Sequence, residues 1–129
     1  YTFHLYALDL APELPPALPG VELNWRWAFV PITNVSAMQL TAQVNNKTDV
    51  REVNRIMKTA AEGKLAGILG YTELPLVSCD FNHDPRSAVI DGSQTRVSGD
   101  TGVSVLAWFD NEWGYANRML DTTLALLSA

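Results

Sequence analysis

The chain has 129 residues, which is enough for one domain built around a single hydrophobic core. Its net charge of −5 at pH 7 and its scattered basic residues argue against a nucleic-acid partner. The single cysteine, Cys79, excludes an internal disulfide, and no run approaches the roughly 20 apolar residues of a membrane span. Because the chain begins at Tyr1 rather than at methionine, we expect a piece of a longer cytoplasmic protein.

The first 29 residues predict an irregular segment. Four prolines and a glycine fall within nine positions, which excludes a helix interior and a central strand: Pro12, Pro15, Pro16, Pro19 and Gly20. The next segment, from Ile32 to Val44, predicts a strand with one buried face. Alternate positions on that face are mainly apolar, namely Ser36, Met38, Leu40, Ala42 and Val44.

The clearest predicted helix follows Thr48 and Asp49, either of which can accept hydrogen bonds as its N-cap. Its apolar residues have the three-and-four spacing of one helix face: Val50, Val53, Ile56, Met57, Ala60 and Ala61. Gly63 is predicted to end the helix in the left-handed conformation that glycine adopts at low cost.

The segment after this helix predicts short strands joined by turns. Leu65–Val77 is expected to be mostly extended, and residues 80–86 form a polar loop. Short strands are predicted at residues 88–91, 95–98 and 103–109, separated by turns at residues 92–94 and 99–102. Short connections favour antiparallel neighbours. We therefore predict an α+β fold with a mainly antiparallel or mixed sheet and helices on one face.

The last predicted helix, residues 111–127, starts at a polar junction where Asp110 or Asn111 can be the N-cap. Its apolar stripe needs a surface to pack on: Trp113, Ala116, Met119, Leu120, Thr123, Leu124 and Leu127.

Two other groups of residues could have a chemical role, but a structural role explains each of them better. Cys79 and His83 could form a nucleophile and base, but a cysteine after an apolar run is more often a core residue. Residues 80–84 place oxygens at alternate positions, as a calcium loop does, but Pro85 replaces the glycine that such a loop requires. A hydrogen-bonded Asp/Asn turn explains the loop better. No glycine-rich nucleotide-binding motif occurs, and no metal site is predicted.

The run Trp108–Asp121 resembles the C-terminal signature of the glyceraldehyde-3-phosphate dehydrogenase family. Further matching segments follow in the family's order, at residues 30–36, 60–63, 67–73 and 75–81. The resemblance assigns residues 30–129 to the C-terminal part of the catalytic domain and leaves residues 1–29 unmatched. Residues 80–85, 95–99 and 117–123 look most like the erythrose-4-phosphate dehydrogenase branch.

The resemblance implies a cytoplasmic oxidoreductase of carbohydrate metabolism and pyridoxine biosynthesis, which oxidises a small phosphorylated aldehyde with NAD through a cysteine thiohemiacetal. The family's catalytic cysteine, histidine and NAD-binding half belong to segments N-terminal to the match, so no catalytic residue is assigned here and the chain alone is expected to be inactive. By resemblance, Asn111 hydrogen-bonds the nicotinamide carboxamide and Tyr115 packs near it. Glu112 is a neighbouring, structural position of that cofactor site.

One departure from the family keeps a second hypothesis open. The family's phosphate-binding arginine just before Val-Pro is absent, because Ala28 and Phe29 precede Val30. The alternative is a non-catalytic structural or interaction domain derived from the same fold. An enzyme piece would have the missing N-terminal half or a homo-oligomer, a tetramer in the family, as its partner. It should then expose a large apolar face.

Overall fold

The computed structural model describes residues 27–32 and 35–128, with side chains from residue 35 onward. The elements are β1 (Trp27–Ile32), β2 (Val35–Gln43), α1 (Val50–Glu62), β3 (Leu69–Thr72), the 3-10 helix η1 (Ser78–Phe81), β4 (Ala88–Ser98), β5 (Gly102–Phe109) and α2 (Asn111–Leu127). The sheet order is β1-β2-β5-β4-β3, with β3 and β4 parallel and the other neighbours antiparallel. The predicted α+β class with a mixed sheet is confirmed.

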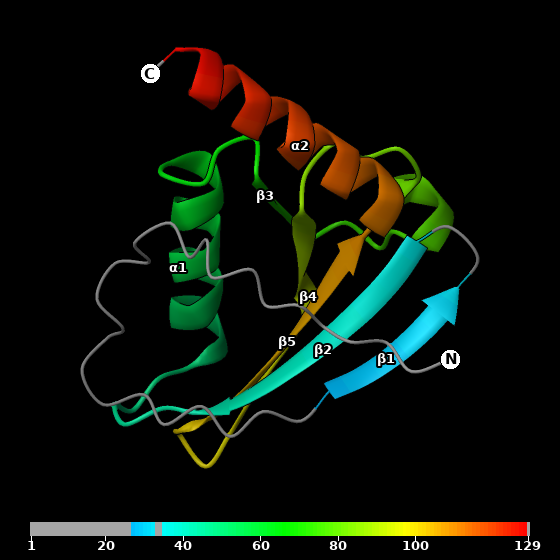
Figure 1. Cartoon of the computed structure of the whole chain (residues 1–129). Coiled ribbons are helices and arrows are strands. Elements are labelled where there is room, and N and C mark those ends of the chain that lie inside the picture. The colour runs from blue at the N-terminus through cyan, green and yellow to red at the C-terminus, as the bar shows by residue number, and fades with distance from the viewer. Residues whose placement is uncertain (1–26, 33–34, 129) are drawn as a thin grey trace.

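The two helices lie at different places around the sheet (Figure 1). α1 packs beside β3 and β4, whereas α2 crosses the end of the sheet where β5 finishes. Because β5 runs antiparallel to β2 and β4, this end also holds the start of β2 and of β4. The β5–α2 junction therefore lies beside segments from two other parts of the chain.

One face of the sheet packs against α1, as the alternation in β2 predicts. Val53 of α1 forms a core cluster with Val103 and Val105 of β5, and four partly buried residues join them: Leu40, Val44, Met57 and Val97. A second cluster of Val35, Phe81 and Val89 lies at the end of the sheet near α2. The core is thus divided between the sheet face that α1 covers and the end of the sheet beside the β5–α2 junction.

Two strand boundaries differ from the sequence prediction. Ile32 pairs with Val35 across two antiparallel strands, so the predicted strand from Ile32 to Val44 is wrong at its start. The predicted turn at residues 92–94 is also wrong, because β4 is one strand with a register shift between Asp91 and Arg96. A bulge uses the same small polar residues as a turn, and the sequence does not distinguish them.

The segment around the end of α1 differs as well. The strand there covers only residues 69–72, because residues 63–68 form turns rather than extended chain. Gly63 is the C-cap residue with φ −114°, so the predicted left-handed conformation is wrong. A Cβ at this position would lie 2.8 Å from the carbonyl oxygen of Thr59, and this crowding explains the glycine. The N-cap of α1 is Asp49, whose Oδ1 accepts from the Glu52 N–H at 2.8 Å.

Candidate functional site

The candidate site is built on Asp110, the N-cap of α2. Its carboxylate is buried, with 3% of the residue exposed. One oxygen, Oδ1, accepts from the backbone N–H of Trp113 at 3.1 Å, and Oδ2 accepts from the backbone N–H of His83 at 2.9 Å. The first bond satisfies a free N–H of the helix, and the second attaches a separate loop. Asp110 therefore joins α2 to the segment that follows η1.

Residues 81–86, which begin with the last residue of η1, support the junction along their length. Phe81 stacks on Trp108 with ring centroids 5.6 Å apart and an interplanar angle of 9°. The His83 ring lies against Trp113, with centroids 4.6 Å apart. We call residues 81–86 the support loop. Because it contacts the residues on both sides of Asp110, it fixes the direction in which α2 leaves the sheet.

Gly114 allows α2 to approach the support loop closely. This glycine is buried, and a Cβ on it would lie 3.0 Å from the carbonyl oxygen of Arg86. One turn later, the Arg118 guanidinium comes within 3.4 Å of the carbonyl oxygens of Gly67 and Pro85. Besides Trp113, the helix thus contacts the support loop and the turn after α1 through a glycine and an arginine, not through its leucines.

Asp91 holds the other side of the junction. It is 4% exposed, and its Oδ2 accepts from the Trp108 indole N–H at 3.2 Å. Its Oδ1 accepts from both the N–H and the hydroxyl of Ser93 inside the β4 bulge. The Trp108 ring is therefore held on one face by the stacked Phe81 ring and at its indole N–H by the Asp91 carboxylate.

The three residues assigned by resemblance lie together at the start of α2. Asn111, Glu112 and Tyr115 all have exposed side chains, and Tyr115 is 60% exposed. Asn111 and Tyr115 are four residues apart, so they share one side of the helix. An exposed amide carries both a donor and an acceptor, which matches the two polar groups of a carboxamide. The residues present are therefore suitable for holding a nicotinamide amide, although the assignment stays a prediction.

The residues of the calcium-loop hypothesis and of the Cys79–His83 hypothesis each contact other groups instead of one another. The loop carboxylates face different groups: Asp80 accepts from the Val77 N–H, Asp84 from Arg86, and Asp91 from Ser93 and Trp108. Within the described part of the chain, no group of three or more His, Cys, Asp or Glu residues could hold a metal ion. Cys79 is exposed in η1, so the expectation that it is a core residue is wrong, and His83 packs on Trp113. No helix among the same residues is long and apolar enough to cross a membrane.

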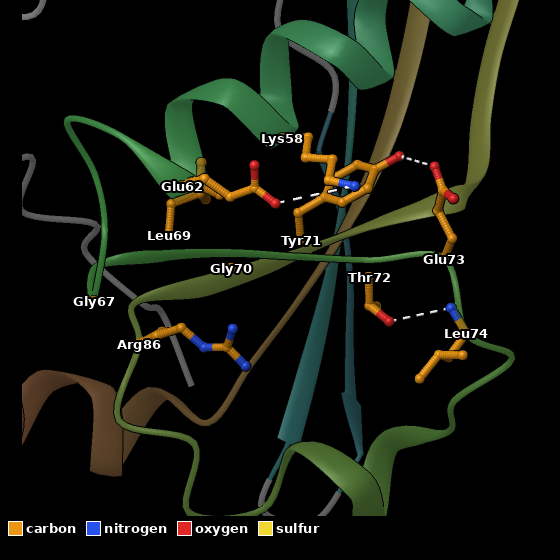
Figure 2. A pocket seen from close by; sticks show the side chains of 11 residues that line it. Lys58, Glu62, Gly67, Leu69, Gly70, Tyr71, Thr72, Glu73, Leu74 and Arg86 are labelled. Atoms are coloured by element: carbon orange, nitrogen blue, oxygen red, sulfur yellow. Dashed lines mark hydrogen bonds and ion pairs between the residues drawn. The ribbon is translucent and has the colours of Figure 1, made fainter.

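A hollow of about 450 Å³ lies elsewhere, around the edge strand β3 (Figure 2). Lys58, Glu62 and Tyr71 lie on one side of the strand, and Arg86 lies on the other. The polar groups there bind one another, since Lys58 lies 4.0 Å from Glu62 and the Tyr71 hydroxyl donates to Glu73 at 2.6 Å. The hollow does not include the α2 residues assigned to the cofactor.

Three groups in or beside this hollow have shifted pKa values. Burial, followed by the hydrogen bond to the Glu73 carboxylate, raises the pKa of the Tyr71 phenol to about 12. Hydrogen bonds from the Arg86 side chain, opposed by burial, lower the pKa of Asp84 below its ordinary value. The same pairing raises the pKa of Arg86. All three shifts move the pKa values further from neutral pH, so each side chain keeps its ordinary protonation state there.

The family model described as glyceraldehyde 3-phosphate dehydrogenase, C-terminal domain, matches residues 10–111. This is more than half of the chain. The chain belongs to this family. The family consists of NAD-dependent oxidoreductases, and this chain carries its C-terminal domain. The match begins 20 residues before the boundary predicted at residue 30, and residues 1–26 lie outside the described residues.

Sequence reasoning identified the junction but missed the residues that hold it. Asp110 was one of two candidate caps, and nothing indicated that its second oxygen binds the support loop. The sequence suggests His83 as a candidate base, whereas its backbone N–H and its ring both contact the junction. The dense polar and aromatic composition of residues 108–115 was the available signal, but it carried no information about the loop 27 residues earlier.

Proposed function

We propose that this chain forms the C-terminal, nicotinamide-side part of an NAD-dependent dehydrogenase of phosphorylated aldehydes, with erythrose 4-phosphate as the preferred substrate. The proposal is supported by the family match and by the exposed side chain of Asn111, which directly follows the buried cap residue Asp110. The reactive cysteine would come from the N-terminal part of the enzyme. NAD, when bound, supplies the hydride acceptor, while Asn111 and Tyr115 orient and cover its carboxamide end.

The packing of α2 supports an enzyme part rather than a complete domain. The side of the helix toward the support loop carries Gly114 and Arg118, while large apolar residues elsewhere on α2 are more than half exposed: Met119, Leu120, Leu124, Leu126 and Leu127. Apolar surface of this kind marks a missing partner. We propose that the partner is the N-terminal half of the same enzyme.

The test is a fusion enzyme, in which this chain replaces the C-terminal part of a family member that supplies the cofactor-binding half and the cysteine segment. We expect NAD reduction by the fusion enzyme and none by the chain alone. We also expect a higher kcat/KM with erythrose 4-phosphate than with glyceraldehyde 3-phosphate. The opposite preference would contradict the proposed branch.

Asn111→Ala should raise the KM for NAD about tenfold, because about one net hydrogen bond is lost. Asn117→Ala is the matched control: it is in the same helix, and its side chain donates to the Trp113 carbonyl oxygen at 2.8 Å instead of lying at the junction. Equal KM values for the two variants would refute the cofactor role. A folded fusion enzyme with no turnover would favour the non-catalytic interaction domain, which the missing arginine before Val30 also favours.

A further inference from the structure

We propose that Asp110 is a positioning residue for Asn111, which it orients by binding α2 and the support loop with separate carboxylate oxygens. This inference rests on the proposed function of Asn111. It adds a residue that does not contact the cofactor but decides where the contacting amide points. It also gives a structural role to the support loop.

The first step of the argument is that Asn111 has no support of its own. Its side chain is exposed, and within residues 35–128 no protein group hydrogen-bonds to it. Its direction is therefore set by its backbone, at the first position of α2. First-turn residues fray unless a cap holds them. The cap is Asp110, the residue directly before it.

The second step is that Asp110 does more than cap a helix. A serine or threonine cap supplies one acceptor oxygen, which is enough for the Trp113 N–H. Asp110 supplies a second oxygen that accepts from the His83 N–H at 2.9 Å, and both oxygens are buried with the residue 3% exposed. Helix and loop are thus held at a fixed separation by one rigid planar group.

The third step is that the loop end of this connection is strained. His83 has φ +59°, the left-handed region that costs a non-glycine residue free energy. Such a conformation persists when several contacts hold it. Here the contacts are the bond to Asp110 and the packing of the His83 ring on Trp113. The structure therefore maintains strain in order to keep the loop against the start of α2.

The test replaces the second oxygen while keeping the cap. Asp110→Ser retains an acceptor for the Trp113 N–H and removes the one that binds the His83 N–H. Asp49→Ser is the matched control, since Asp49 caps α1 through a single oxygen and lies away from Asn111 in the sequence. Both variants keep a residue that favours N-caps, so both helices still form.

In the full 129-residue chain, NMR reads the local effect. Asp110→Ser should speed hydrogen exchange of the His83 N–H at least about tenfold and leave the Trp113 N–H protected. The order parameter of the Asn111 backbone N–H should fall in the same variant and stay unchanged in Asp49→Ser. An unchanged Asn111 order parameter in Asp110→Ser would overturn the proposal.

In the fusion enzyme, kinetics read the functional effect. Asp110→Ser should raise the KM for NAD about tenfold, as expected when a positioned group moves, whereas Asp49→Ser should not. The double variant Asp110→Ser/Asn111→Ala should be no worse than Asn111→Ala alone, because the two residues act through one group. Additive losses would overturn the positioning role. If Asn111→Ala leaves the KM unchanged, the proposed function fails, while the NMR result still decides whether Asp110 orients Asn111.

Discussion

The two helices start in the same way and pack in opposite ways. Asp49 and Asp110 each cap a helix by accepting the N–H three residues later. α1 then turns Val53 to the sheet and buries it, with Met57 partly buried beside it. α2 turns Gly114 toward the support loop and leaves Leu124 65% exposed. A cap therefore sets where a helix begins, but not which of its sides is buried.

This difference separates a helix that is complete within the chain from one that is not. Burial of Val53, with Met57 partly buried beside it, stabilises the fold through the sheet, as in most amphipathic helices. The exposed leucines of α2 contribute little to the stability of this chain. Their contribution would appear only when a partner covers them. The comparison can be tested by changing one helix, or its support, at a time.

The largest effect is expected from Phe81→Ala, which removes the ring that supports the junction. Phe81 is 2% exposed and stacks on Trp108. Its loss should reduce the free energy of unfolding by about 3–5 kcal/mol, as for other buried Phe→Ala changes. Urea unfolding followed by far-ultraviolet circular dichroism measures this. Leu74→Ala, at a residue 63% exposed, is the control. Similar losses in both variants would show that the support loop does not hold the junction.

The two caps should differ when each is replaced by alanine. Asp49→Ala removes one cap bond and should cost about 1 kcal/mol. Asp110→Ala removes a cap bond and also leaves the His83 N–H without its partner, so a loss of about 2–4 kcal/mol is expected. Thermal and urea unfolding of both variants give the comparison. Equal losses would mean that the bond to the support loop adds no stability.

Apolar truncation should distinguish the buried from the exposed helix face. Val53→Ala removes buried methyl groups from the cluster under α1 and should cost about 2 kcal/mol. Leu124→Ala should change the stability of the isolated chain by less than about 0.5 kcal/mol. In the fusion enzyme, the loss of stability caused by Leu124→Ala should rise toward the loss caused by Val53→Ala. If it stays near zero there, the N-terminal half does not cover α2.

The smallest effect is expected from acid titration of Asp84, which supports the loop near α2. Because Arg86 lowers the pKa of Asp84 in the folded state, the pair stabilises the fold above the ordinary pKa of 3.8. This stabilisation is lost as the pH falls below that value and through the lowered pKa. Asp84→Asn should therefore weaken the dependence of the unfolding midpoint on pH below 3.8. If the unfolding midpoint depends on pH in the same way in the unchanged chain and in Asp84→Asn, the expectation is contradicted.

Local patterns predicted most of the elements. The helices at residues 50–62 and 111–127 and the strand at residues 102–109 agree with the apolar periodicity and the cap residues. The errors fall where one residue type serves two local geometries. Small polar residues at 92–94 suited a turn but form a bulge, and Gly63 suited a left-handed cap but relieves crowding against Thr59. Both outcomes depend on neighbours that spacing alone does not specify.

The sequence by itself determined the family, the α+β class and the position of the junction, because periodicity, caps and rare motif residues are local properties. Only the tertiary structure decided that Asp110 binds His83, that Asp91 binds Trp108, and that α2 exposes its leucines. These contacts join residues far apart in the chain, and sheet pairing brings them together. A buried carboxylate chooses its second partner from whatever the fold places beside it, so the sequence pattern around Asp110 does not predict that partner.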